Sequence, residues 1–343
     1  MLKKNEDQIF HQAVKPLNIP LGGMLFSTRL TNTLSKKLAA LIDADTEILN
    51  VHDKTFKVAG YFSHFNKFAK SAWMMNDLPL ARWNAERFEI REGWQKKILR
   101  WLADLPEITA MRKLNSVIVL DNLNKAVVLR YLGKNAEVVR SGLDITEFKG
   151  LPRELDLNNK PLRLLMVGIM STHRRFEDAI MAVSILKNLG KNVILDIVGP
   201  YDKNSDYKKF LDGIIVEKEL QETVKFLGPV PETALLEAYK SHDIFLFPNH
   251  NQTWGLSVFE AMAMGLPVVV SKTCGASEMV ADGVTAYLVD PKSPEQIAEK
   301  INLLLDPGNY KNISAAAYEF ARKNISWDAY AQGMESIFKN LVK

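Results

Sequence analysis

Apolar runs of strand length recur through the second half of the chain, and they lack alternation of apolar and polar residues. They lie at Arg163–Ile169, Val193–Val198, Val224–Leu227, Ile244–Phe247, Pro267–Ser271 and Ala286–Val289. Continuous apolar runs of about four to eight residues are typical of strands covered on both faces. Helical patterns separate them, and one opens with the capping sequence Ser293–Gln296. Repeated β-α units of this kind predict a parallel, doubly wound sheet.

The first half of the chain is less regular and predicts a smaller α/β domain. Strands are expected at Glu47–Val51, Ala72–Met75, Val117–Leu120 and Val138–Arg140. Helices are expected near Thr31–Ile42, Phe56–Phe68, Gly93–Leu105 and Asn122–Leu132. A polar stretch at 156–161 has the composition of a linker. We therefore expect domains at residues 1–155 and 160–325, followed by a C-terminal helix in 326–343.

Composition narrows the classes of function without choosing one. The chain has 343 residues and a net charge of +4, an excess that suits an anionic ligand but does not indicate nucleic-acid binding. Cys274 is the single cysteine, which excludes an internal disulfide and favours a reducing compartment. No apolar run approaches the ~18 residues of a membrane span, and the N-terminus does not resemble a signal peptide. A cytoplasmic protein is expected, with the inner face of the membrane as an alternative location.

Glycines follow most of the predicted strands of the second half. They are Gly168, Gly199, Gly228, Gly255 and Gly275. Ligands of open parallel sheets bind beyond the C-terminal ends of the strands. Turns alone also require glycine, but five on one edge favour a ligand-binding edge.

The most informative segment is Asn249–Pro267, in which a strand ends, a polar loop follows and a helix begins near Gly255. The free N–H groups and the positive dipole end of such a helix suit a diphosphate. Glu260 lies about one turn inside this otherwise apolar helix. A carboxylate there would accept hydrogen bonds from ribose hydroxyls or pair with a basic neighbour, and position alone leaves both open.

This segment resembles the hallmark of the family-four glycosyltransferases, which have the GT-B fold. The hallmark is Glu, seven residues, Glu, then Ala-Met-Ala-x-Gly-x-Pro, and its two acidic positions correspond to Gln252 and Glu260. Other segments agree with the family in order and spacing: Val167–Arg174, Phe226–Pro231, Ser271–Glu278 and Tyr287–Val289. In the first half, Asn50–Asp53, Trp73–Asp77, Ser116–Leu120 and Ser141–Asp144 resemble it more loosely.

The resemblance implies two Rossmann-like, doubly wound parallel-sheet domains that face a cleft. It implies that the N-terminal domain is incomplete by about one βαβ unit, with Gly22-Gly23 as a partial substitute for the missing glycine loop. It also implies that the C-terminal helix packs back toward the N-terminal domain. The implied activity is transfer of a sugar, with retention, from a nucleoside diphosphate sugar to a glycan, lipid or small-molecule acceptor, without a metal or other cofactor.

The resemblance also assigns roles to residues. The catalytic positions would be Arg174, Gln252 and Asn76. The donor would be held by Gly168, Arg174, Gly228, Val230, Thr253, Trp254, Gly255, Leu256 and Glu260. The acceptor side would include His52, Asp53 and Asp77.

Several positions depart from the family pattern. Gln252 replaces a Glu, Ile169 replaces an Arg and Asn76 replaces a His, while His173 would help Arg174 only if protonated. With the short N-terminus, these departures favour the alternative of a catalytically silent GT-B subunit that retains the nucleotide site. A Rossmann-type dehydrogenase is disfavoured because no Gly-x-Gly-x-x-Gly follows any predicted strand.

Three weaker signals have more than one interpretation. Asp43-Ala44-Asp45 imitates a metal motif but precedes a strand, which favours a solvated turn. For His52-Asp53, a helix-capping aspartate competes with acceptor binding. For Trp94–Leu102, a core-facing helix with solvated lysines is favoured over docking on a membrane surface toward a lipid-linked acceptor.

Overall fold

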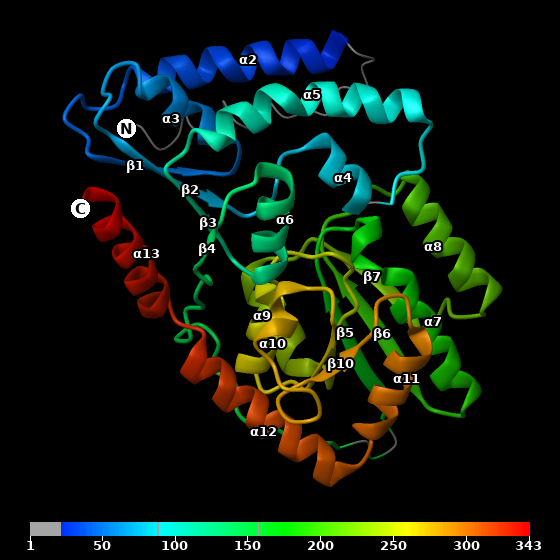
Figure 1. Ribbon diagram of the computed structural model, residues 1–343. Helices are drawn as coiled ribbons and strands as arrows, with labels where there is room; N and C mark the ends of the chain where they lie inside the picture. The colour runs from blue at the N-terminus through cyan, green and yellow to red at the C-terminus, as the bar shows by residue number, and fades with distance from the viewer. Residues whose placement is uncertain (1–21, 88, 157, 159) are drawn as a thin grey trace.

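The computed structural model describes residues 22–87, 89–156, 158 and 160–343, which form two α/β domains (Figure 1). Each domain is built on a parallel sheet, so the predicted fold class is confirmed. The predicted runs become strands within one or two residues of their expected bounds. The reason is that strands covered on both faces are apolar throughout, as all four residues of β8 (Ile244–Phe247) are.

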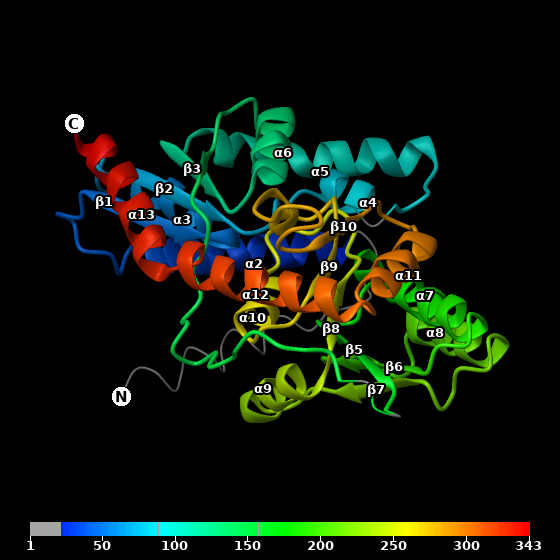
Figure 2. The same ribbon diagram turned by 90° about the horizontal axis from the view of Figure 1, so that it is seen from below.

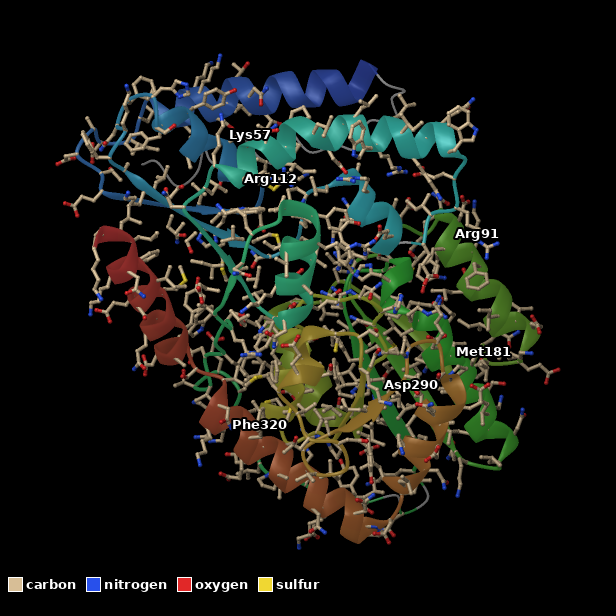
Figure 3. All side chains as sticks on the ribbon, in the orientation of Figure 1. Lys57, Arg91, Arg112, Met181, Asp290 and Phe320 are labelled. Carbon is tan, nitrogen blue, oxygen red and sulfur yellow. The ribbon has the colours of Figure 1, made fainter. Side chains whose placement is uncertain are left out.

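The N-terminal sheet has the order β1-β2-β3-β4. Its strands are β1 (Ile48–His52), β2 (Lys70–Met75), β3 (Ser116–Val119) and β4 (Glu137–Val138). The associated helices are α2 (Gly22–Ala39), α3 (Phe56–Phe62), α4 (Ala81–Arg87), α5 (Trp94–Arg112) and α6 (Asn122–Leu132). Trp73 and Met75 face α3, α5 and α6 in one core. Lys57 of α3, labelled in Figure 3, pairs with Glu107 of α5 at 2.6 Å.

The C-terminal sheet has the strand order β10-β9-β8-β5-β6-β7. The order in which successive strands are added reverses between β5 and β8, although all strands are parallel. Its remaining strands are β5 (Leu162–Val167), β6 (Val193–Val198), β7 (Val224–Gly228), β9 (Val268–Ser271) and β10 (Tyr287–Val289). The helices are α7 (Phe176–Asn188), α8 (Asp206–Glu217), α9 (Glu232–Ser241), α10 (Leu256–Ala263), α11 (Pro294–Leu303) and α12 (Pro307–Asn324). Residues of α7, α8 and α11 share one core and residues of α9 and α10 share the other, so this sheet is doubly wound. Ligands of such sheets bind at the reversal point.

The second face of the N-terminal sheet is covered by a helix from the end of the chain. Its strand order contains no reversal among the described residues, so the doubly wound description applies to the C-terminal sheet. Ala72, Met74 and Ile118 on the second face share a core with Met334 of α13 (Trp327–Val342). In both ribbon views α13 lies along β1 and β2 (Figures 1 and 2). The last helix of the chain therefore completes the first domain.

Some helices differ from the sequence-based expectations. The pattern missed α4 and α12, placed the end of α3 too late and placed the start of α2 too late. Gly22 and Gly23 open α2 and do not form a loop between a strand and a helix. The helix α5 continues past Pro106 because Ile108 and Met111 near its end are buried against the sheet.

The core-facing interpretation of the first turns of α5 is wrong. Trp94, Ile98, Trp101 and Leu102 are each 46–69% exposed, with Lys96 and Lys97 beside them. The helix turns only its later part toward the sheet, so periodicity alone could not show which part of the apolar stripe is covered.

The connection between the domains is fixed by one arginine. The Arg153 guanidinium donates to the carbonyls of Tyr239, Lys240 and His242 at the end of α9, and to the carbonyl of Met264 at the end of α10. These distances are 2.8–3.0 Å. Carbonyls at helix C-termini lack partners within the helix, and a cation there is favourable.

We predict that Arg153→Met lowers the free energy of unfolding by about 2 kcal/mol, because it removes charged hydrogen bonds to helix ends. Urea unfolding followed by circular dichroism measures this. Lys311→Met is the matched control, since Lys311 pairs only at the surface with Glu154. Equal stabilities of the two variants would contradict this function of Arg153.

Candidate functional site

Arg174 lies at the point where the C-terminal sheet reverses direction. It ends the short helix η2 (Thr172–Arg174), which follows β5. Its guanidinium lies over Gly168, where an added Cβ would be 3.0 Å from Nη1. With the Asn249 amide turned to satisfy both of its groups, Asn249 donates to the Arg174 carbonyl and accepts from Nη1, each at 3.1 Å.

The charge of Arg174 has no acidic partner among the residues that the structure describes, whereas the adjacent Arg175 pairs with Glu177 and Asp178. Its Nε is buried and meets no hydrogen-bond acceptor. Burial, and then the nearby Arg87, lower the pKa of Arg174 to about 10, which leaves the group charged at neutral pH. A half-buried cation without a carboxylate is costly, so this position suits an anionic ligand.

His173 does not add a second charge. Its Nδ1 lies 2.9 Å from Ser171 Oγ, and its Nε2 lies 2.9 Å from Gln252 Oε1. Burial, followed by Arg87 and Arg174, lowers the pKa of His173 to about 3. The ring is therefore neutral at pH 7 and orients Gln252 through a hydrogen bond.

The loop after β8 positions the start of α10. Gly255 has φ of +115°, and an added Cβ would be 3.0 Å from the Phe247 ring, so both conformation and space require glycine here. The N–H groups of Gly255, Leu256 and Ser257 have no protein acceptor in the described part of the chain. The loop thus presents free amides at the positive end of α10.

Thr253 and Trp254 occupy supporting positions in this loop. Their side chains are 9% and 3% exposed. The Trp254 N–H donates to Asp121 Oδ2 of the N-terminal domain at 2.8 Å. In this arrangement the Trp254 amide holds the two domains together and does not face the free amides of α10.

Asp121 and Glu278 join the domains at the start of α6. Asp121 caps α6 through Asn124 N–H at 2.7 Å while it binds Trp254. Glu278, from η3 (Gly275–Glu278) of the other domain, accepts from the amides of Asn122 and Leu123. Two carboxylates, one from each domain, therefore satisfy the N-terminus of one helix.

Glu260 pairs with a phenol. Its Oε2 accepts from Tyr239 Oη of α9 at 2.7 Å, so pairing with a basic neighbour is wrong among the described residues. Burial raises the pKa of Glu260, and the Glu232 carboxylate in the first turn of α9 adds to this rise. The first turn of α9 directly follows Gly228 and Val230, so the Glu232 carboxylate and the end of β7 lie on the same side of the site.

The acceptor-side residues predicted from the sequence line one cavity of about 630 Å³. Its walls include His52, Asp53, Asn76, Asp77 and Asn84. Asp53 accepts from Asn76 N–H at 3.0 Å and from the Asn76 amide at 3.1 Å, so the helix-capping interpretation of Asp53 is wrong. Asp53 thereby fixes Asn76, the position where the family has a histidine.

Arg87 was missed by the sequence analysis. It ends α4, a helix that the pattern did not reveal, and is 4% exposed. Its Nη1 donates to Asp77 at 2.5–2.6 Å, and its Nη2 lies 3.4 Å from Gln252 Oε1 across the cleft. Arg87 thus connects the cavity to the loop that presents α10.

Two further observations concern other kinds of site. Across the described residues, no group of three or more His, Cys, Asp or Glu side chains is placed to hold a metal ion. Asp43–Asp45 form a turn before β1, at the end of the sheet away from the cleft. Within the same residues, no helix has both the length and the hydropathy of a membrane span.

Comparison with known proteins identifies the family. The sequence model of the glycosyl transferases group 1 matches residues 148–323, just over half of the chain. The chain belongs to this family. A D-inositol 3-phosphate glycosyltransferase of Corynebacterium glutamicum is 32% identical over 145 residues, which are 42% of this chain and 34% of the relative. The same-named protein of Corynebacterium kroppenstedtii is 22% identical over 306 residues, which are 82% of this chain and 67% of the relative.

The chain thus spans about a third of the length of the first of these relatives. Solved structures extend the likeness to the whole fold. Sucrose-phosphate synthase from Thermosynechococcus elongatus has a TM-score of 0.75 at 20% identity, covering 95% of this chain and 81% of its own. Anabaena Alr3699/HepE, solved with UDP and glucose, has a TM-score of 0.73 at 18% identity, covering 91% and 82%.

We predict that Glu260→Gln stabilises the protein at pH 7.5. When folding raises the pKa of a carboxyl group, the folded protein becomes less stable as the pH rises from the ordinary value of 4.5 through the pKa of the folded state. The amide avoids that loss, so its melting midpoint should exceed the wild type by roughly 2 °C at pH 7.5. The difference should vanish near pH 4. Differential scanning fluorimetry measures it, with Glu237→Gln on the exposed face of α9 as control; a Glu260→Gln midpoint below the wild type at pH 7.5 would contradict it.

Proposed function

We propose that the protein transfers a sugar, with retention, from a nucleoside diphosphate sugar to an acceptor hydroxyl. The observation that carries this is the half-buried Arg174, which has a buried Nε without an acceptor and no acidic partner in the described residues. It shares the edge of the sheet with the free amides of α10. In the reaction the bond from the anomeric carbon to the diphosphate breaks, and a bond to the acceptor oxygen forms. The departing diphosphate oxygen keeps the electron pair and takes up the proton that the acceptor oxygen loses.

The departing diphosphate gains negative charge as this bond breaks, and groups fixed beforehand stabilise such charge most effectively. In the proposal, Arg174 supplies the cation and Gly255 and Leu256 supply backbone N–H groups, so no metal is required. Gln252, held by His173, would bind a hydroxyl of the sugar. Glu260 would accept from the ribose, beside Gly228 and Val230, which would meet the base.

The acceptor would enter the cavity of the N-terminal domain. A volume of about 630 Å³ is large enough for a sugar-sized group, and polar groups of His52, Asn76 and Asp77 line it. The relatives named for D-inositol 3-phosphate support a hydroxyl-rich acceptor. A glycan or a lipid-linked glycan meets the same description.

The silent-subunit alternative rests on Gln252, whose carbonyl oxygen is already used by His173 and Arg87. Such a subunit would bind nucleotide without cleaving a donor. Release of nucleoside diphosphate from a donor sugar, with or without transfer, would exclude it.

We predict that calorimetry detects binding of UDP or GDP to the wild type. Arg174→Ala should weaken it at least tenfold because the diphosphate loses its buried cation. Glu260→Ala should weaken the nucleotide and the nucleoside alike, because it acts on the ribose. Arg130→Ala, at an exposed arginine of α6, is the control. If neither nucleotide binds the wild type, the donor site is wrongly assigned.

We also propose that the exposed face of α5 contacts an anionic membrane surface, which would bring the enzyme to a lipid-linked acceptor. Trp94, Ile98 and Trp101 lie at helical spacing on this face, and Lys96 and Lys97 adjoin it. Exposed aromatic and basic residues together favour the interface of an anionic bilayer.

Vesicle flotation tests this contact. The wild type should float with vesicles rich in phosphatidylglycerol and much less with phosphatidylcholine alone. Replacing Trp94, Ile98 and Trp101 by Ser should abolish flotation, whereas Val216→Ser, at an exposed position of α8, should not. A wild type that stays in the aqueous fraction would eliminate the membrane contact.

A further inference from the structure

Arg87 belongs to the acceptor-side domain, but its guanidinium reaches the donor side of the cleft. It extends from the end of α4 and is almost completely buried. One nitrogen, Nη1, is held by both oxygens of Asp77. The other, Nη2, makes a long contact of 3.4 Å with the neutral Gln252 amide oxygen.

Arg87 and Arg174 place two like charges close together. Arg87 and His173, the neighbour of Arg174 in the chain, both contact Gln252 Oε1, at 3.4 and 2.9 Å. Burial and then Arg87 lower the pKa of Arg174, and burial followed by both arginines lowers the pKa of His173, which stays uncharged. The Asp77 carboxylate balances one of the two charges. Like charges in a partly buried site repel, and a bound anion with two negative charges would relieve this repulsion.

The loop after β5 holds a second cation, Arg175, but its guanidinium is paired with Glu177 and Asp178. Ile169, where the family pattern has an arginine, is 62% exposed and brings no charge. The diphosphate of a donor would therefore meet one cation from this domain, Arg174. The nearby Arg87 comes from the opposite domain, and its planar fork can bind Asp77 and a phosphate oxygen at the same time.

We propose that Arg87 is the second cation of the diphosphate site and is supplied across the cleft by the acceptor-side domain. The inference rests on the proposed function. On donor binding, Nη2 exchanges its long contact with Gln252 for a phosphate oxygen, while Nη1 remains on Asp77. A neutral amide at position 252 makes this exchange easy, whereas a glutamate would hold Arg87 by a salt bridge.

This arrangement links the two substrates. Asp77 both lines the acceptor cavity and holds Arg87. A donor thus finds both cations only when the two domains are together. Arg87 is accordingly a donor-binding residue whose position depends on the wall of the acceptor cavity.

The test compares a nucleoside diphosphate with the matching monophosphate, UDP with UMP or GDP with GMP, by calorimetry. Arg87→Gln should weaken the diphosphate at least tenfold and the monophosphate less than threefold. A general structural disturbance would weaken both alike. Arg87→Lys keeps the charge but loses the planar guanidinium, so it should give an intermediate loss of diphosphate affinity. This variant serves as the test if Arg87→Gln does not fold. Arg130→Gln, in the same domain, is the control.

Gln252→Glu provides a second arm. It should weaken binding of the nucleoside diphosphate in the wild-type background. The effect should be smaller in Arg87→Gln, because the new glutamate then has no guanidinium with which to form a salt bridge. Unchanged diphosphate affinity in Arg87→Gln, with binding by the wild type intact, overturns the inference and leaves the proposed function standing. Absence of any nucleotide binding by the wild type overturns both.

Discussion

The geometry of the site depends on one buried carboxylate that serves two domains at once. Asp121 is fully buried and accepts from the N–H of Asn124 in its own helix and of Trp254 in the other domain. Burial raises the pKa of Asp121, while these hydrogen bonds favour the charged form. The bond to Trp254 fixes the loop that leads to Gly255, and through it the free amides of α10. This contact also requires glycine at position 275, because an added Cβ on Gly275 would lie 2.6 Å from Asp121 Oδ2.

Several elements far apart in sequence keep the domains close enough for this contact. Glu278 reaches the start of α6, Arg153 fixes the connection against the ends of α9 and α10, and α13 returns to the first sheet. The apolar core is continuous from Met74 of the first domain to α10 of the second. Each domain therefore supplies side chains or helices that complete the other, so the arrangement of the domains depends on residues from the whole length of the chain.

The sequence predicted the strands and the loop before α10 well, since both depend on local patterns: apolar runs for the strands, and a glycine between a polar loop and an apolar helix for the site. It grouped His52, Asp53 and Asp77 correctly on one side because residues after parallel strands share a sheet edge. It could not find Arg87, because its importance comes from contacts with Asp77 ten residues away and with Gln252 across the cleft. It favoured a helix cap for Asp53 over acceptor binding, because the contact with Asn76 depends on the pairing of β1 with β2, which the sequence does not show.

The charges of the cleft explain why the domains would cooperate in binding. Arg174 is held by Asn249 of its own domain, but Arg87 reaches the same region only through Asp77 and the end of α4. In the absence of an anion these cations repel each other, which opposes the attraction of Asp121 and Glu278 across the same gap. An anion between them converts the repulsion into attraction to a common partner. The balance between these opposing electrostatic contributions would then depend on the donor, so a bound donor would favour the arrangement of the two domains described here.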